Sequence, residues 1–268
     1  MSYEIIALDI DGTLTNAKKE ITPHTLETLL AVQKQGKKVI LASGRPTPGL
    51  THYAETLKLD EYGGYLLSYN GAKITQYHTK EVIVNQTLPP DMIPCLYAFA
   101  KEHELGIISY ENDGILCGNG IDSYIELEKR INGIPLKEVD NFPDYITFPV
   151  NKCLMTGPDE KMAVMEQELK NLYGDQLSIY RSEAFFLEIM PPNVDKANSL
   201  SHLLAHLNLT KEQLIACGDG YNDRSMIRYA GLGVAMANAK EEVKQDADII
   251  TKSNEEDGVA AVVTQYMM

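Results

Sequence analysis

The chain has 268 residues and a formal net charge of -14, values that suggest about two folded domains with a well-solvated acidic surface. This charge argues against nucleic-acid backbones and anionic membranes as general partners. No uninterrupted apolar stretch approaches the ~20 residues of a membrane span, and the first apolar run is too short for a secretory signal, so we expect a cytoplasmic protein.

The first predicted element is a buried strand over residues 4–8, and two acids follow it directly. Its apolar run ends at Asp9 and Asp11, and Gly12 gives the chain freedom to turn away from the sheet. Alternate residues of a strand face the same way, so both carboxylates can share one crevice. Two such charges ~4 Å apart repel by roughly 4 kcal/mol at an effective dielectric near 20, so we expect a cation or a shared proton between them. For this pair alone, a helix cap or a solvated loop is the alternative.

The rest of the first half alternates between strands and helices. The expected elements are a helix from Pro23, capped by Thr22 and stopped at Gly36, a strand over 38–42, a helical stretch near 47–58, a strand over 65–69 and a hairpin of the runs 72–77 and 82–86. Ser43 and Gly44 stand between the second strand and the next helix. Hydroxyl and backbone donors at that position can bind phosphate oxygens, although an ordinary capped turn has the same sequence.

A segment between Pro89-Pro90 and Pro191-Pro192 carries its own alternating elements and indicates an inserted domain. Helical patterns lie near 91–104, 121–132 and 159–172, and β-like runs lie near 106–117, 152–156, 177–181 and 185–190. We therefore predict a core domain of residues 1–85 and 192–268, with an inserted α/β cap domain at 86–191.

The second half returns to strand and helix alternation, which implies a parallel sheet. The expected elements are a helix from 196, a strand over 214–217, a helix over 222–230, a strand over 232–236, a helix over 239–245, a strand over 247–250 and a final helix. Lys196 can place an ammonium among carboxylates, unless it is a solvated lysine in a first helical turn. Asp219 and Asp223 can face the crevice of Asp9 and Asp11, and such hard oxygen ligands suit Mg²⁺; taken singly, they would pass as turn and cap acids.

Four of these segments, in this order, resemble the motifs of the haloacid dehalogenase superfamily. They are the segment around Asp9, the Ser43-Gly44-Arg45-Pro46 turn, Asp195-Lys196-Ala197 and the run from Gly218 to Asp223. The space between the second and third motifs resembles the Cof-type branch, which inserts a large α/β cap there, and Asn70-Gly71-Ala72 looks like the same branch. The resemblance implies a doubly wound, Rossmann-like parallel-sheet core and a magnesium-dependent phosphatase of small phosphate monoesters, with sugar phosphates as the favoured class.

The same resemblance implies a role for each site residue. Asp9 would attack phosphorus and form an aspartyl-phosphate, and Asp11 would serve first as general acid and then as general base. Mg²⁺ would be held by the Asp9 carboxylate, the Asp11 backbone carbonyl and Asp219, while Asp223 would orient its neighbours. The residues expected to bind phosphate are Ser43, Gly44, Lys196 and Asn222. For Asn222, positioning of Lys196 and a turn-forming asparagine are the alternatives.

Two other functions remain open from the sequence. A phosphomutase of the same superfamily fits these motifs, and so does a non-catalytic protein that binds a phosphorylated metabolite. A haloacid dehalogenase needs neither magnesium nor a second acid, so Asp11 argues against it. The expected partner is a small phosphorylated metabolite, and the sequence predicts no oligomeric state.

Overall fold

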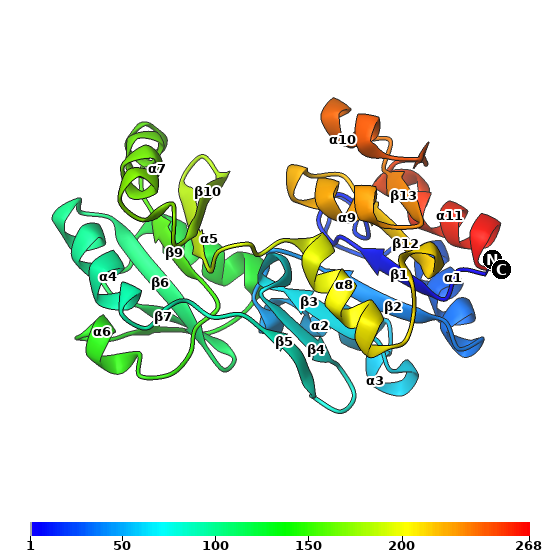
Figure 1. Ribbon diagram of the computed structural model, residues 1–268, viewed down its shortest axis with the longest axis horizontal. Helices are drawn as coiled ribbons and strands as arrows, with labels where there is room; N and C mark the ends of the chain where they lie inside the picture. The colour runs from blue at the N-terminus through cyan, green and yellow to red at the C-terminus, as the bar shows by residue number, and fades with distance from the viewer. Residues whose placement is uncertain (1) are drawn as a thin grey trace. The chain divides into compact units, whose positions relative to one another are not determined.

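A computed structural model describes residues 2–268, which fold into two compact units (Figure 1). The first unit contains the residues up to Arg45, Leu50–Val84 and Asp195–Met268, and the second contains Pro46–Gly49 and Asn85–Val194. The second unit begins one residue before and ends three residues after the range 86–191 predicted for the cap. The four residues Pro46–Gly49 were predicted as core, yet they belong to the second unit.

The first unit is built on one twisted sheet with the strand order β14-β13-β12-β1-β2-β3-β4-β5. The strands are β1 (Ile5–Leu8), β2 (Lys38–Ala42), β3 (Tyr65–Ser68), β4 (Lys73–Gln76), β5 (Val82–Asn85), β12 (Leu214–Gly218), β13 (Leu232–Ala235) and β14 (Ile249–Ile250). Pairings from β14 to β3 are parallel, and β4 runs antiparallel to β3. The predicted doubly wound α/β core is therefore confirmed.

Both faces of this sheet are covered because its central strands are apolar on both sides. Ile6 and Leu8 of β1 belong to a buried cluster with α1 and α11, whereas Ile5 and Ala7 belong to a second cluster with α8. The helices of this unit are α1 (Pro23–Lys34), α2 (Thr51–Thr56), α3 (Leu59–Tyr62), α8 (Lys196–His206), α9 (Arg224–Tyr229), α10 (Glu241–Asp246) and α11 (Gly258–Tyr266). Thr22 caps α1 as predicted, since its side chain accepts a hydrogen bond from the backbone N–H of Thr25.

The parallel pairing of β12, β1, β2 and β3 brings their carboxyl ends to one edge of the sheet. Open α/β sheets bind ligands in the crevice beyond this edge. The segments that follow these four strands carry the residues singled out in the sequence, with Lys196 added from the first turn of α8. The fold therefore gathers residues that are distant in sequence at one place.

The second unit contains a sheet with the order β10-β11-β9-β6-β7-β8, antiparallel except between β7 and β8. Its strands are β6 (Gly106–Glu111), β7 (Gly114–Cys117), β8 (Leu136–Glu138), β9 (Cys153–Thr156), β10 (Ser178–Glu183) and β11 (Phe186–Met190). Its helices are α4 (Met92–Glu102), α5 (Ser123–Asn132), α6 (Phe142–Tyr145) and α7 (Asp159–Tyr173). Apolar residues of α4, α6 and α7 form one buried cluster with the sheet.

Two details of this unit differ from the sequence-based prediction. The run 106–117 forms a hairpin of two strands, because Asn112 adopts a φ of 47° and reverses the chain between β6 and β7. The short elements β8 and α6 were not predicted. Among residues 2–268, no helix is both long and apolar enough to cross a membrane.

Candidate active site

Asp9 is fixed at the end of β1 by its own backbone. Its N–H donates to the Cys217 carbonyl at 3.1 Å, and its carbonyl accepts from the Leu14 N–H at 3.1 Å. The residue is only 7% exposed, so its carboxylate is largely removed from water. A buried acid needs charged or polar partners, and these come from other elements of the first unit.

The main partner is the ammonium of Lys196, which is fully buried. Its Nζ donates to Asp9 Oδ1 at 2.7 Å, to Asp223 Oδ1 at 2.6 Å and to the Ala42 carbonyl at 2.8 Å. All three donors of the ammonium are thus used. Lys196 is the first residue of α8 and follows its N-cap, Asp195. The alternative of a solvated lysine is excluded by this geometry.

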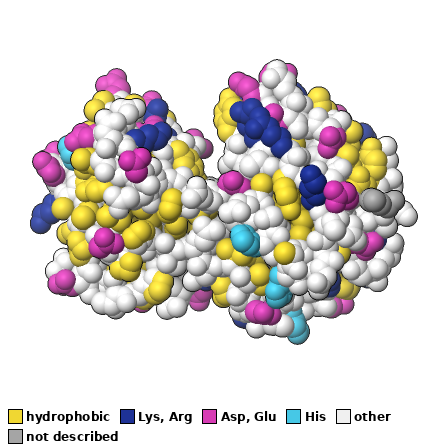
Figure 2. All heavy atoms as spheres, viewed as in Figure 1, with side chains coloured by type: hydrophobic (Ala, Val, Ile, Leu, Met, Phe, Trp, Pro, Cys, Tyr) yellow, Lys and Arg dark blue, Asp and Glu magenta, His cyan; other side chains and the backbone are white. Residues whose placement is uncertain are grey.

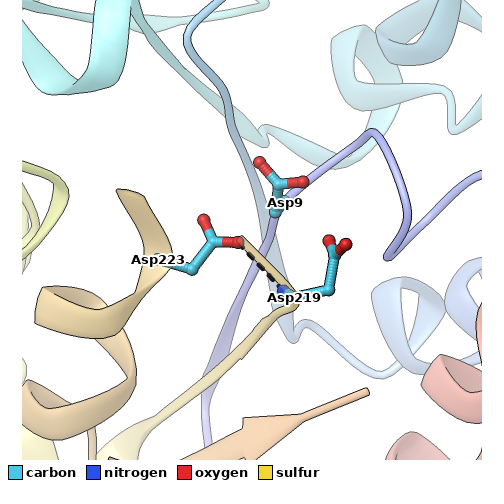
Figure 3. A group of neighbouring side chains, drawn as sticks. All are labelled: Asp9, Asp219 and Asp223. Carbon is cyan, nitrogen blue, oxygen red and sulfur yellow. Dashed lines mark hydrogen bonds between the residues drawn. The ribbon is translucent and has the colours of Figure 1, made fainter. Parts of the chain in front are cut away.

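The two carboxylate oxygens of Asp223 have different partners. Besides the contact with Lys196, its Oδ2 accepts the backbone N–H of Asp219 at 3.0 Å and that of Gly220 at 2.9 Å. Figure 3 shows the first of these bonds and the three aspartates side by side. Asp223 therefore orients both the ammonium and the turn that carries Asp219.

The Asp219 carboxylate contacts residues of the loop that follows Asp9. Its Oδ1 accepts the hydroxyl of Thr13 at 2.9 Å. Gly12, with a φ of +84°, packs so closely that a Cβ there would lie 2.4 Å from Asp219 Oδ2. Only glycine combines that backbone conformation with that approach.

The charges of the cluster do not balance. Asp9, Asp219 and Asp223 each offer a carboxylate oxygen within 4.8 Å of the others, and Lys196 supplies one positive charge. Burial and the charge of Asp223 raise the pKa of Asp9 well above its ordinary value, although Lys196 opposes this shift. Burial also raises the pKa of Asp219, to about 6. Burial disfavours the ammonium, yet Asp223 and Asp9 outweigh it and raise the pKa of Lys196.

This donor set fits a small hard cation. Carboxylate oxygens are the ligands that Mg²⁺ prefers, and a divalent ion would compensate the excess negative charge. Asp9 and Asp219 are the two predicted carboxylate ligands that the structure brings together. The third member of the cluster is Asp223, whose two oxygens already accept hydrogen bonds from protein donors.

The side chain of Asp11 engages two cations that the sequence analysis did not assign to the site. Arg45 forms a two-bond fork with it, from Nε to Oδ2 and from Nη2 to Oδ1, each at 2.8 Å. Lys19 Nζ adds a contact of 2.7 Å to Oδ1. Burial opposes the effect, but Arg45 and Lys19 lower the pKa of Asp11 below its ordinary value. Arg45 was visible in the Ser-Gly-Arg motif, whereas no sequence signal marked Lys19.

The predicted phosphate-binding residues lie at neighbouring strand ends. Ser43 follows β2, is 3% exposed and accepts the Arg45 N–H on its Oγ at 3.2 Å. Asn222 follows β12, and its Nδ2 donates to Asn70 Oδ1 at 3.1 Å. Gly44 packs against the same Asn70 side chain. The structure thus brings the Ser43-Gly44 turn and Asn222 to the carboxamide of one side chain, Asn70.

Comparisons with known proteins agree with this arrangement. A family model described as haloacid dehalogenase-like hydrolase matches residues 6–263. A putative phosphatase of Bacillus subtilis strain 168, YxeH, is 32% identical over 269 residues, which cover 99% of each protein. A B. subtilis relative named 5-amino-6-(5-phospho-D-ribitylamino)uracil phosphatase, YcsE, is 27% identical over 268 residues that cover 100% of this chain and 97% of the relative.

A solved structure is similar over almost the same length. It is a crystal structure of a haloacid dehalogenase-like hydrolase from Bacteroides thetaiotaomicron, with a TM-score of 0.95 and 45% sequence identity. The match covers 98% of this chain and 99% of that one. The similarity therefore includes both compact units.

Proposed function

The chain belongs to the haloacid dehalogenase-like hydrolases, and, taking it as a phosphatase of that family, we propose that it hydrolyses small phosphate monoesters through an aspartyl-phosphate on Asp9. One observation carries the proposal: the buried ammonium of Lys196 joins Asp9 to Asp223 at the carboxyl edge of a parallel sheet, beside Asp219. An arrangement with this much buried charge is costly for folding, and a reacting anionic group explains why it is kept.

Asp9 is the proposed nucleophile because its carboxylate is both buried and held in place. Its oxygen attacks phosphorus, a P–O bond to Asp9 forms, and the bond to the ester oxygen breaks. Water then attacks the aspartyl-phosphate, which releases inorganic phosphate and restores Asp9. The contact with Lys196 keeps one carboxylate oxygen fixed and places a positive charge where phosphate oxygens gather.

Asp11 is proposed to give a proton to the departing alkoxide and then to take one from the attacking water. In the structure both of its oxygens accept N–H donors from Arg45, and Lys19 contacts one of them. These cations stabilise the ionised form of Asp11, so protonation becomes easier when one of the contacts opens. Because Lys19 is 56% exposed and Arg45 only 10%, Lys19 is the contact that opens at lower cost.

Magnesium is the proposed cofactor, held by Asp9, Asp219 and the Asp11 backbone carbonyl. When bound, it would orient the phosphate and offset the negative charge that develops during transfer. Asp223 is proposed to orient Lys196 and the turn of Asp219, in keeping with the three hydrogen bonds that its carboxylate accepts from Lys196, Asp219 and Gly220. Ser43, Gly44 and Asn222 are proposed to contact the phosphate.

The proposed substrate class is small phosphorylated metabolites, with sugar phosphates first. The relative YcsE is named for a phosphorylated ribityl compound, which supports testing polyol phosphates early. Figure 2 shows Lys and Arg in separate small groups among Asp and Glu on the face that it draws, which gives no support to a nucleic-acid partner. The four free cysteines support the cytoplasm as the proposed location.

Phosphate release from a panel of metabolites tests the proposal. The panel includes sugar phosphates, pyridoxal phosphate, flavin phosphates and nucleotides, each with Mg²⁺ and then with a chelator. We expect release from at least one class, lost with chelator and restored by added Mg²⁺. Isomerised sugar phosphate without free phosphate would instead identify a phosphomutase. Substrate-like binding without any turnover would identify a binding protein.

A further inference from the structure

The turn after β3 has a backbone that few residues adopt. Tyr69 and Asn70 both have a φ of 52°, and Gly71 follows with a φ of 105°. Three successive residues in the left-handed region are costly when two of them carry a Cβ. Such strain persists only where the surroundings impose it, and it is concentrated at functional sites.

The surroundings that impose it are parts of the active site. The Tyr69 N–H donates to the Arg45 carbonyl, and the Asn70 N–H donates to the Ser43 carbonyl, each at 2.9 Å. On the other side, the Ser199 hydroxyl of α8 donates to the Gly71 carbonyl at 2.7 Å. The turn is thus fixed between the Ser43-Gly44 segment and the helix that begins with Lys196.

The Asn70 side chain contacts two residues already expected to bind phosphate. Its Oδ1 accepts the Asn222 Nδ2 at 3.1 Å. A Cβ placed on Gly44 would lie 3.2 Å from both the Nδ2 and the Oδ1 of Asn70, so the carboxamide packs directly on the Gly44 backbone. One side chain therefore contacts residues that follow two different strands, β2 and β12.

We propose that Asn70 is a positioning residue of the phosphate site, which fixes the Asn222 carboxamide and the Gly44 backbone for the phosphoryl group. This inference rests on the proposed function and extends it to a residue at the end of a third strand. The Asn70 Oδ1 fixes the orientation of Asn222 because it uses one amide hydrogen of that side chain. Contact with Gly44 restricts the backbone that faces the phosphate oxygens.

The backbone alone does not explain an asparagine here. Glycine adopts a φ of +52° without strain, so it would form the same turn at lower cost. Asparagine tolerates this conformation better than most residues and adds a carboxamide. The carboxamide is the part that contacts Asn222 and Gly44, so its removal separates the positioning role from the turn itself.

The test replaces Asn70 by glycine, with Asn208→Gly as the matched control. Asn208 is an exposed asparagine of the same unit with a φ of 54°. For a phosphate ester that the wild-type protein hydrolyses, we expect kcat/KM of Asn70→Gly to fall about threefold to tenfold, the usual effect of losing a hydrogen bond between neutral groups. The dissociation constant of inorganic phosphate should rise similarly. The melting temperature should not fall, and Asn208→Gly should match the wild type in kcat/KM and phosphate affinity.

A double variant tests the route through Asn222. If Asn70 acts through that residue, Asn70→Gly should cost much less in an Asn222→Ala background than alone. Full multiplication of the two losses would overturn this route, and an Asn70→Gly protein with unchanged kcat/KM and phosphate affinity would overturn the inference. If the wild type hydrolyses nothing but binds phosphate, the proposed function fails and phosphate affinity still decides the role of Asn70. If it binds no phosphate either, both fail.

Discussion

Replacing Lys196 by methionine should destabilise the fold in a way that depends on pH. Methionine is similar in length and carries no charge, so the change removes the ammonium that contacts Asp9 at 2.7 Å and Asp223 at 2.6 Å. At an effective dielectric of about 20, each contact represents about 6 kcal/mol of attraction before desolvation is counted. The net loss is smaller, about 3–5 kcal/mol, because both partners were removed from water.

Proton uptake by the cluster limits that loss. Protonating a carboxyl group with an ordinary pKa of 3.8 costs a free energy of about 4 kcal/mol at pH 7 and about 2 kcal/mol at pH 5. In Lys196→Met the loss of the ammonium should make one of the crowded carboxyls take up a proton, so the folded variant binds more protons than the folded wild type. Its deficit relative to the wild type should therefore shrink as pH falls, from about 3–4 kcal/mol at pH 7 to about 1–2 kcal/mol at pH 5.

Urea denaturation at both pH values measures this difference. Lys101→Met, at an exposed lysine of α4, serves as control and should stay within about 0.5 kcal/mol of the wild type. Phosphatase activity of Lys196→Met should fall at least about a hundredfold. A deficit under 1 kcal/mol at pH 7, or one that grows as pH falls, would refute the electrostatic reasoning.

Three further perturbations address other contacts of the site. Gly12→Ala should lower the free energy of unfolding and weaken Mg²⁺ binding, measured by calorimetry, because its Cβ would meet Asp219. The control Gly36→Ala, at a φ of +89° with open space around it, should cost only backbone strain of about 1 kcal/mol. Equal Mg²⁺ affinity in both variants would contradict this. Because the pKa of Asp219 is raised to about 6, the folded protein without metal should lose stability as pH rises from about 4 through 6. The rise in melting temperature that Mg²⁺ produces should therefore be larger at pH 7.5 than at pH 5. Equal rises at the two pH values would count against a metal at this carboxyl. Arg45→Met should lower the free energy of unfolding by about 0.5–1 kcal/mol at pH 7, since Asp11 is partly exposed, and by less as pH falls through the lowered pKa of Asp11. A loss of stability that persists at pH 3 would show that the two-bond fork does not stabilise the fold by charge.

The sequence was most informative where short apolar runs end in polar residues. The strands before Asp9, Ser43 and Asp219 were predicted within a residue or two, and parallel pairing then requires their ends to meet. Asp223 could be placed near Asp9 for the same reason, whereas Lys196, the first residue of a helix, was placed there by the order of the family motifs. For the residues that follow strands, backbone position alone determines the neighbourhood.

Side-chain directions were harder to predict. Asp11 was expected to share a crevice with Asp9, and its carboxylate also engages Arg45 and Lys19, contacts that strand periodicity does not predict. Lys19 itself has a φ of 63°, a backbone conformation that the residue pattern does not predict. Contacts made by long side chains from turns depend on tertiary packing, which periodicity does not report.

Short elements of the second unit were missed for a related reason. The strand Leu136–Glu138 has three residues and the helix Phe142–Tyr145 has four, too few for either periodicity to show. The hairpin at Asn112 was read as one strand because both of its arms are apolar. Local turn chemistry at Asn112 and Asp113 was the available signal.

Direct detection of the phosphorylated protein tests the central claim. The wild type is mixed with Mg²⁺ and its best ester, quenched in acid within one turnover and digested for mass spectrometry. Asp9→Asn and the control Asp113→Asn are treated in the same way, and Asp113 is an exposed aspartate of the second unit. We predict one phosphoryl group on Asp9, removable by hydroxylamine, in the wild type and in Asp113→Asn, and neither phosphoryl group nor turnover in Asp9→Asn. Undiminished turnover by Asp9→Asn, or a phosphoryl group on another residue at the catalytic rate, would contradict the account.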